Sequence, residues 1–502
     1  MNHKFDELTK NLAQSMTRRG ALKKFGVGIP ALALAGLLTS SADAQVSALG
    51  PFLEISQPNP VGGCDDGFRL PGTWTINDAA EPYAVVNPNN PNNIVASWIL
   101  GPAQNIICGV SRNGGRNWQQ VSIPLSICSG GPYAGAGDPG LSFAPNGDLY
   151  AVNIAGMTLP ERAIFVNKSS DGGLHWSAPI LVPGTAGTMP DRPTITADRT
   201  DPRFAYAIWP SHTDKNQTPP AFARTTNGGL SWEPARAIFQ PASHHYVDNN
   251  QIFVLGDGTL VAVCFAFYEP GSQPPKVQNL AILRSADKGQ SWSAPTFGPA
   301  ITPVFQPNGL NGVVDPETGL YLHDPGDPAF AQDTRSGNLY AVWEDARFSN
   351  FQYDDIAFSM SSDGGLTWSP PIRVNRTPLN IPPLNRQAFQ PSIGVLGDGT
   401  IGVSYYDFRL NDANPGLPTD YWLVQCHPSA SAPCTEPGNW GSEVRLTSNS
   451  FDLEKCMVFP EGEFFLGDYV GSLVGSGNSF VATFTAVDQS GVTAIFGRRV
   501  GQ

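Results

Sequence analysis

The octapeptide Ser169-Ser-Asp-Gly-Gly-Leu-His-Trp176 decides the fold, because the chain repeats it. Four other segments align with it without gaps, at 111–118, 225–232, 285–292 and 361–368. All five begin with Ser or Thr, carry Asp or Asn third and Gly fifth, and end in Trp. Their starts lie 56 to 76 residues apart, which indicates an internal structural repeat and not a chance similarity.

The chemistry of the octapeptide predicts a closed hairpin turn. The carboxylate of Asp171 can accept backbone N–H groups within the turn, and Gly173 can adopt the positive φ that other residues resist. Trp176 then sets a large apolar face against neighbouring strands. We therefore expect the residues of these turns to be structural and not catalytic.

A strand of the type Leu149-Tyr-Ala-Val152 also recurs along the chain, at 205–209, 260–263, 339–343, 401–404 and 480–483. Units of several short strands repeated around an axis form a β-propeller, so we predict an all-β propeller with four-stranded blades. The units span 81–118, 138–176, 191–232, 246–292, 327–368, 387–440 and 464–499. This division favours seven blades, and six if one unit is an insertion in a larger blade. The last unit lacks an outer strand, which residues 52–56 can supply to close the ring.

The composition fits a folded chain and narrows its partners. Hydrophobic residues make up 41% of the 502, charged residues only 15%, and Gly (53) and Pro (46) are abundant, as in a fold with many turns. Residues 1–44 carry a net charge of +3, so the remainder carries −16. Nucleic acids and anionic membrane surfaces are bound through clusters of Lys and Arg, so neither is expected as a partner.

The N-terminal segment has the features of an export signal. Thr17-Arg-Arg-Gly-Ala-Leu-Lys23 precedes an apolar run at 25–38 and the small-residue sequence Ala42-Asp-Ala44. This order is typical of a twin-arginine signal peptide, although Ala21 stands where Phe is usual. We predict a signal peptide at 1–44, a single propeller domain at 45–502, and a periplasmic or secreted location. A short membrane anchor is the alternative, but 14 apolar residues are few for a bilayer. No later segment has transmembrane length, so we expect a mature chain that is not inserted in the membrane, and a monomer.

All seven cysteines follow residue 44, where an oxidising compartment permits disulfides. Spacing along the sequence favours two pairs, Cys426 with Cys434 and Cys108 with Cys128. An odd number leaves at least one thiol free, and no spacing resembles a zinc site. We therefore expect structural or inert cysteines.

The five octapeptides, known as Asp boxes, resemble those of the sialidase superfamily, and the resemblance covers the whole chain after residue 44. It implies a sialidase-like propeller, a carbohydrate or glycoconjugate as ligand, arginines that bind a substrate carboxylate, an Asp acid and a Tyr–Glu nucleophile pair. Phe68-Arg69-Leu70-Pro71 fits the family's Arg-Ile/Leu-Pro motif, with Arg69 as a carboxylate ligand. The chain departs from the family in its first blade, where 97–105 has neither the Arg nor the Asp of the acidic loop.

Two later loops have the missing character. Asp345-Ala-Arg347 and Asp407-Phe-Arg409 each follow the second strand of a blade, at the end of the strands opposite to the Asp box. We predict that these loops form a carboxylate-binding rim, with Asp345 or Asp407 as the acid and Arg347 and Arg409 as ligands. Two alternatives stay open: an Asp–Arg pair that holds its own loop, and a structural calcium ion. No other cofactor is expected.

Three further segments complete the hypotheses. Arg192 of Asp191-Arg-Pro193 is a candidate carboxylate ligand, and Tyr469 a candidate nucleophile if Glu463 lies near it. The leading hypothesis is a sialidase-like exo-glycoside hydrolase acting on terminal acidic sugars. The second is a non-catalytic propeller that binds glycan or protein. The third is a polysaccharide lyase, favoured only by His244-His-Tyr246.

Overall fold

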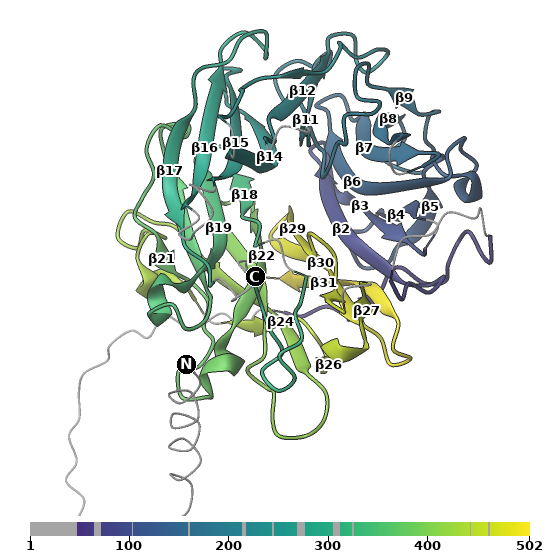
Figure 1. Ribbon diagram of the computed structural model, residues 1–502. Helices are drawn as coiled ribbons and strands as arrows, with labels where there is room; N and C mark the ends of the chain where they lie inside the picture. Colours follow the sequence, from purple (N-terminus) through teal and green to yellow (C-terminus); the bar gives the residue numbers. More distant parts are fainter. Residues whose placement is uncertain are drawn as a thin grey trace, which may run out of the picture. The chain divides into compact units, whose positions relative to one another are not determined.

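The computed structural model describes residues 48–64, 72–102, 104–158, 161–212, 217–242, 245–268, 277–304, 312–323, 326–441, 443–459 and 462–501. Within these residues the chain is all-β and builds six four-stranded antiparallel sheets, a seventh sheet in which a fifth strand joins the four, and a two-stranded sheet. The seven larger sheets follow one another around a ring in chain order, from the purple β2 to the yellow β29 (Figure 1). The predicted propeller with seven blades is thereby confirmed. The proposed signal peptide at 1–44 lies outside the described residues.

The first four blades each contain four consecutive strands, the innermost first. Blade 1 is β2 (Ala79–Asn87), β3 (Asn90–Leu100), β4 (Asn105–Ser111) and β5 (Gln119–Ser122); blade 2 is β6 (Gly135–Phe143), β7 (Leu149–Gly156), β8 (Ala163–Ser169) and β9 (Ile180–Leu181). Blade 3 is β10 (Thr194–Ala197), β11 (Ala205–Pro210), β12 (Pro220–Thr225) and β13 (Arg236–Ala237); blade 4 is β14 (His245–Val254), β15 (Leu260–Tyr268), β16 (Val277–Ser285) and β17 (Thr296–Ile301).

The last three blades carry the irregular features. Blade 5 is β18 (Ala329–Gln332), β19 (Leu339–Asp345), β20 (Asp355–Ser361) and β21 (Ile372–Arg373); blade 6 is β22 (Ala388–Val395), β23 (Ile401–Asp407), β24 (Pro418–Cys426) and β25 (Val444–Arg445), with β26 (Phe451–Asp452) paired to β24. Blade 7 is β29 (Gly471–Ser476), β30 (Ser479–Val487), β31 (Thr493–Gly501) and β1 (Leu53–Glu54). The remaining elements are β27 (Met457–Val458), β28 (Phe464–Phe465) and the 3-10 helices η1 (Ile127–Ser129), η3 (Ala346–Ser349), η4 (Pro383–Arg386), η5 (Pro437–Asn439) and η6 (Leu453–Lys455). Among the described residues, no helix has the length and apolar character that crossing a membrane requires.

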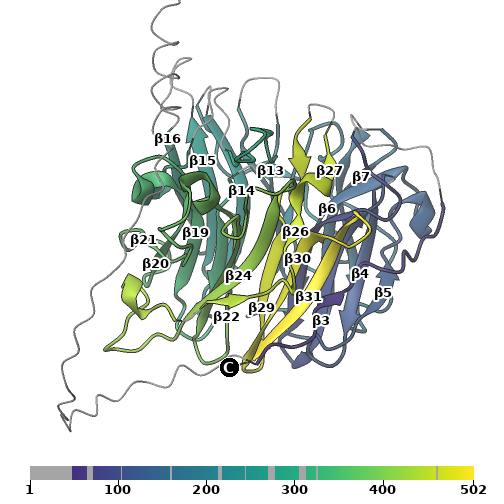
Figure 2. The same ribbon diagram turned by 90° about the horizontal axis from the view of Figure 1, so that it is seen from below.

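Strand β1 closes the ring, as the sequence predicted. It pairs antiparallel with β31, with Leu53 opposite Gly497, and Figure 2 shows β29, β30 and β31 side by side in this blade. Ile55 beyond β1 is buried, and Phe52 stacks on Phe496 at 4.6 Å between ring centroids. The first strand of the fold thus supplies the outer strand of the last blade.

The Asp boxes form the predicted turns between the third and fourth strands of blades 1 to 5. In blade 2, Asp171 Oδ1 accepts the backbone N–H groups of Leu174 and His175 at 3.0 Å, and Ser169 donates its hydroxyl at 2.9 Å. Burial raises the pKa of Asp171, but the hydrogen bonds to the His175 ring and within the turn have the larger effect. Together they bring the pKa of Asp171 down to about 2. Gly173 has φ of +101°, as expected for its place in the turn.

The same turns connect neighbouring blades. A basic residue directly precedes the Asp box in three blades: Lys168, Arg224 and Arg284. Each side chain donates to a main-chain carbonyl in the Asp box of the next blade, at the fourth residue of that box. The acceptors are Gly228 at 3.0 Å, Lys288 at 2.7 Å and Gly364. From blade 7, Arg499 donates in the same way to Gly114 of blade 1 at 2.7 Å. We call these contacts the blade latches.

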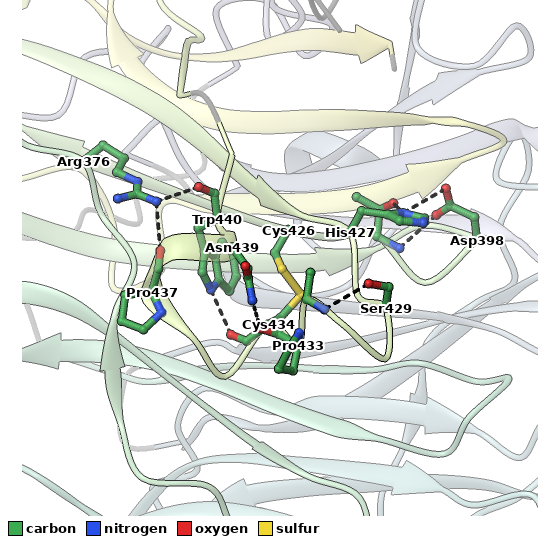
Figure 3. The surroundings of a disulfide bond; sticks show 12 residues. Arg376, Asp398, Cys426, His427, Ser429, Pro433, Cys434, Pro437, Asn439 and Trp440 are labelled. Carbon is green, nitrogen blue, oxygen red and sulfur yellow. Dashed lines mark hydrogen bonds and ion pairs between the residues drawn. A yellow bond between two sulfur atoms is a disulfide. The ribbon is translucent and has the colours of Figure 1, made fainter. Parts of the chain in front are cut away.

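Blades 6 and 7 lack an Asp box for different reasons. In blade 7 the third and fourth strands come from opposite ends of the chain, so no turn joins them. In blade 6 the turn after β24 is held by the disulfide Cys426–Cys434 (Figure 3). Trp440 donates its ring N–H to the Cys434 carbonyl at 2.9 Å and packs edge-on against Phe358, as an anchor for this loop.

The pair Cys426–Cys434 was predicted correctly, and the second predicted pair was wrong. Cys128 is bonded to Cys64, and Cys108 is a free thiol in β4. Cys108 is fully buried in the core between blades, where burial raises the pKa of its thiol. Its spacing from Cys128 could not show that the side chain faces the core, nor that the segment before blade 1 returns to η1.

Candidate functional site

The inner strands share an irregular start, and this irregularity builds the site. A residue with positive φ occupies the same place in five blades: Glu81, Asp138, Arg192, Asn249 and Gln390, with φ between +36° and +62°. Pairing with the second strand shifts register there in β2, β6, β14 and β22. In blades 5 and 7 a glycine with positive φ comes one residue earlier and an Asp follows it, as Gly326-Asp327 and Gly467-Asp468. The start of every inner strand therefore has a residue with positive φ, and in five blades this residue is not glycine, which is strained backbone of the kind that collects at functional sites.

A cavity of about 250 Å³ lies among the seven inner strands. Its polar lining includes Tyr83, Arg192, Asn249, Gln251, Asp327, Gln390, Ser392, Asp468 and Tyr469. Its size is near the lower end for a small-molecule site, which suits one small polar ligand unit.

Arg192 ties three blades together at this cavity. Its guanidinium donates to Asp248 at 2.5 Å and to Asp327, which belong to blades 4 and 5. Burial lowers the pKa of Arg192, but these two carboxylates outweigh the effect of burial and raise the pKa well above its usual value. The guanidinium is therefore charged, and two of its nitrogens already have carboxylate partners.

Asp138 and Asp191 form a carboxyl pair beside Arg192, which we call the dyad. Both accept the backbone N–H of Arg192, at 2.9 Å and 3.1 Å, so the two carboxyl groups lie close together. Two adjacent carboxylates repel, which favours a state in which the pair shares one proton.

The dyad is asymmetric. Burial, and then the charges of Asp191 and Asp468, raise the pKa of Asp138 to about 7. The pKa of Asp191 moves the other way: burial raises it, but the hydrogen bond from His212 and the charge of Arg192 bring it below its usual value. Below about pH 7 the proton therefore resides on Asp138, the protonation state that a general acid requires.

Tyr469 and Glu81 adjoin the dyad. The Tyr469 hydroxyl donates to the Pro139 carbonyl at 3.4 Å, and burial together with the charges of Glu81 and Asp138 raises the pKa of Tyr469 well above 10. Burial and the charges of Asp138 and Asp468 likewise raise the pKa of Glu81. Any reaction that ionises Tyr469 therefore needs a carboxylate to take its proton.

His323 supports the cavity wall from outside. Its Nδ1 lies 2.9 Å from Glu463 and its Nε2 lies 3.2 Å from Asp468, which lines the cavity. The segment 312–323 is joined to β28 by backbone hydrogen bonds of 2.7 Å and 2.8 Å between His323 or Tyr321 and Phe464. Burial lowers the pKa of His323, but the carboxylates of Asp468 and Glu463 outweigh the effect of burial and raise the pKa to about 9.

Of the residues singled out in the sequence, Arg192 and Tyr469 line the cavity. Glu463, the suggested partner of Tyr469, is bonded to His323. Arg69 and His244 lie outside the described residues. His245 begins β14, and Tyr246 stacks on Phe267 at 5.1 Å.

The two predicted rim loops are each closed by their own Asp–Arg pair. Arg347 donates to Asp345 at 2.7 Å, and the buried Asp345 also accepts Trp343 Nε1 and caps η3. In the other loop, Arg409 donates to Asp407 at 2.6 Å.

Arg409 is further committed outside its loop. It binds Glu443, and its guanidinium lies 3.8 Å from the Trp422 ring centroid. None of the four rim residues is among the described residues that line the cavity. The geometry matches the alternative in which each pair holds its own loop.

The structural calcium ion proposed for these loops would need a group of ligating side chains. Among the residues that the structure describes, no group of three or more His, Cys, Asp or Glu side chains is arranged to hold a metal ion. Near Asp345, Asp354 accepts the Val304 N–H at 2.9 Å and Asp355 binds Arg373 at 2.7 Å.

The sequence also carries a signal for the starts of the inner strands. A polar residue directly followed by Pro recurs at the start of the inner strand, as Glu81-Pro, Asp138-Pro, Arg192-Pro, Asp327-Pro and Gln390-Pro. Pro cannot donate to a strand ladder and marks bulges. Because this polar-Pro dipeptide recurs once per blade in five blades, it marks equivalent positions around the propeller.

The fold and site together define a seven-bladed propeller with a carboxyl-lined central cavity. No protein-family model matches the chain, and neither does any curated protein. Among solved structures it is similar to an α-L-arabinanase of Penicillium chrysogenum complexed with arabinobiose, with 12% identity, 90% of this chain and 98% of that chain covered, and a TM-score of 0.45.

Two further solved structures are similar. The sialidase of Trypanosoma rangeli in complex with the inhibitor DANA has 13% identity, with 76% of this chain and 56% of that chain covered and a TM-score of 0.40. A polysaccharide lyase of family PL25, an ulvan lyase, has 12% identity, with 70% and 79% covered and a TM-score of 0.40. These likenesses concern the fold alone.

Proposed function

We propose that this protein is a carbohydrate-active enzyme, a glycoside hydrolase whose general acid is Asp138. The observation that carries the proposal is the dyad: Asp138 keeps a proton up to about pH 7, and the next residue, Pro139, lines the cavity and accepts a hydrogen bond from the Tyr469 hydroxyl. Cleavage of a glycosidic bond requires a proton donor for the leaving oxygen and a nucleophile for the anomeric carbon.

The residues of the cavity can perform both steps. Asp138 donates its proton to the glycosidic oxygen as the bond to the anomeric carbon breaks. The Tyr469 oxygen bonds to that carbon, and its phenolic proton passes to the Asp468 carboxylate, one of the acidic groups that act on Tyr469. Water then replaces Tyr469 on the sugar, giving one proton to Asp138, while the carboxylate returns its proton to Tyr469. The enzyme regains its starting state.

The charge of the cavity favours a neutral sugar. Arg192 is the one arginine among the described lining residues, and its guanidinium is bound by Asp248 and Asp327. A substrate carboxylate would compete with these residues and meet further acidic groups. A second proposal is sialidase-like exo-cleavage of terminal acidic sugars, since a Tyr nucleophile is what the sialidase resemblance implies. It requires Arg192 to exchange its carboxylate partners for the substrate carboxylate.

A panel of labelled glycosides tests the proposal. We expect the protein from residue 45 onward to hydrolyse at least one neutral glycoside, and Asp138→Asn to lower kcat/KM by about 10²–10⁴-fold. Asp412→Asn, a change on an exposed loop, is the matched control and leaves the rate unchanged. Turnover of sialosides alone would favour the second proposal, and binding without turnover of any sugar would refute the hydrolase.

We also propose that the protein is exported by the twin-arginine route to the periplasm or beyond. Arg18-Arg19 before a short apolar run and the two disulfides support this location. Replacing both arginines by Lys is expected to leave the precursor in the cytoplasm, as seen by cell fractionation. Unchanged export of the double variant would contradict the proposal.

A further inference from the structure

His212 occupies a place in the site that the reaction itself does not require. It follows β11 and is held by its backbone N–H, which donates to the Met189 carbonyl at 3.3 Å. Its ring Nε2 lies 3.2 Å from Asp191 Oδ2, and its Nδ1 lies 3.4 Å from the Thr218 hydroxyl. The side chain is 41% exposed, so its proton can exchange with solvent.

The two carboxyls of the dyad differ in their contacts. Asp138 accepts the Arg192 N–H. Asp191 accepts the same N–H, lies 3.8 Å from Arg192 Nε and also faces His212. The imidazole therefore contacts one member of the dyad and not the other, among the contacts of the described residues.

Other charged groups act on the dyad as a whole. Glu81 and Arg162 influence both carboxyls, Asp468 faces Asp138, and Asp248 faces Asp191. Of these groups, the acids oppose ionisation of the dyad and Arg162 favours it. The His212 contact is the one that distinguishes Asp191 from Asp138 by a direct side-chain hydrogen bond.

We propose that His212 is a positioning residue that, by donating to Asp191, fixes the shared proton of the dyad on Asp138. The proposal rests on the proposed function for its catalytic meaning, because Asp138, whose neighbour Pro139 lines the cavity, is the proposed general acid. The hydrogen bond to Asp191 raises the pKa of His212, so the imidazole tends to carry its charge when Asp191 is ionised. Charge and hydrogen bond act in the same direction.

Removing the imidazole has two expected consequences. The proton is shared more evenly between the carboxyls, because Asp191 has lost the partner that favours its ionised form. The last proton of the dyad also leaves at higher pH, because the positive charge that stabilised the ionised pair is gone. We expect an upward shift of about one pH unit. A residue with only a packing role would produce neither effect.

Carbon-13 NMR of the Asp carboxyl groups tests the inference in the resting protein, without substrate. The two resonances are assigned by their loss in Asp138→Asn and Asp191→Asn. In the wild type we expect the Asp138 signal to titrate near pH 7 while that of Asp191 stays in its ionised position. In His212→Gln, both signals are expected to move, and the midpoint to rise by about one pH unit. His427→Gln, which removes a histidine near Asp398 on an exposed turn, is the matched control and leaves both signals unchanged.

Two results would overturn the inference: a wild-type titration near pH 7 that belongs to Asp191, or a folded His212→Gln protein with an unchanged titration. The first needs no variant of His212, so it decides the matter even if that variant does not fold. A wild type that shows the expected titration but hydrolyses no glycoside would leave the inference standing and refute the proposed function.

Discussion

Asp138 and Asp191 have identical side chains and opposite pKa shifts because their neighbours differ. Burial and acidic neighbours keep the proton on Asp138, whereas the His212 imidazole and the Arg192 guanidinium favour the anion of Asp191. This is the arrangement by which a protein obtains an acid and a base from one type of residue at one pH.

The pH dependence of hydrolysis follows from this difference. An acid must be protonated to act, so kcat/KM is expected to be high below pH 7 and to fall as pH rises through about 7, the pKa of Asp138. A rate profile between pH 5 and 9 measures it. Rates that rise with pH across this range would be inconsistent with Asp138 as the acid.

His323 makes stability depend on pH in a predictable direction. Its pKa of about 9 in the folded protein exceeds the usual 6.5. The stabilisation is therefore fully present below about pH 6.5 and is lost as pH rises toward 9. The melting temperature of the wild type should fall between pH 6.5 and 9.5 more than that of His323→Gln. Parallel pH curves for the two proteins would show that this histidine does not link Asp468 to Glu463 in solution.

At the scale of elements, the Asp-box turn has little tolerance for a side chain at its fifth position. A Cβ on Gly173 would lie 2.8 Å from a methyl group of Val95, and the backbone has φ of +101°. We expect Gly173→Val to lower the free energy of unfolding by about 1–3 kcal/mol. Urea denaturation measures the change, and Gly187→Val, where a Cβ meets nothing within 4 Å, separates the clash from the strain of positive φ.

The blade latches are a second element-scale feature with a testable contribution. Arg284 donates from blade 4 to the Gly364 carbonyl in the Asp box of blade 5. Arg284→Met keeps the aliphatic stem and removes the charged donor, so we expect a loss of about 1–3 kcal/mol. Arg203→Met, at an arginine whose side chain is 70% exposed, is the control and should change stability little. Equal effects of the two variants would contradict a specific role for the latch.

At the scale of the whole molecule, the ring depends on one short pairing between its two ends. Ile55 is 3% exposed and its backbone N–H donates to the Ile495 carbonyl at 2.8 Å. Ile55→Ala is expected to destabilise the propeller by about 2–5 kcal/mol, because a cavity forms at the closure. Calorimetry measures the change; a single, unshifted transition would mean that β1 does not hold the ring closed.

Features encoded locally could be predicted from the sequence. The Asp-box turns, the Cys426–Cys434 loop and the pairing of 52–56 with the last blade depend on short spacings or on the count of repeats. The seven-bladed architecture followed from that count.

The site could not be predicted in the same way, because its residues come from different blades. Asp138 meets Asp191 only when blades 2 and 3 pack together, and it meets Tyr469 only when the ring is closed. A single Asp-Pro dipeptide in the sequence indicates no catalytic role. Asp345 and Arg347 resemble catalytic residues in the sequence. Because they are only two residues apart, however, their side chains are hydrogen-bonded to each other. Arg192 and Tyr469, which line the cavity, could be singled out because they adjoin the inner strands.

The central claim is that a sugar binds in the cavity among the inner strands, with its glycosidic oxygen at Asp138. A crystal structure of the Asp138→Asn variant with a bound oligosaccharide tests it most directly, since the slowed variant preserves the ligand. The account predicts a sugar ring in the cavity, with an oxygen within hydrogen-bond distance of residue 138 and the anomeric carbon facing Tyr469. A sugar bound at Arg347 and Arg409 instead, with the cavity empty, would contradict it.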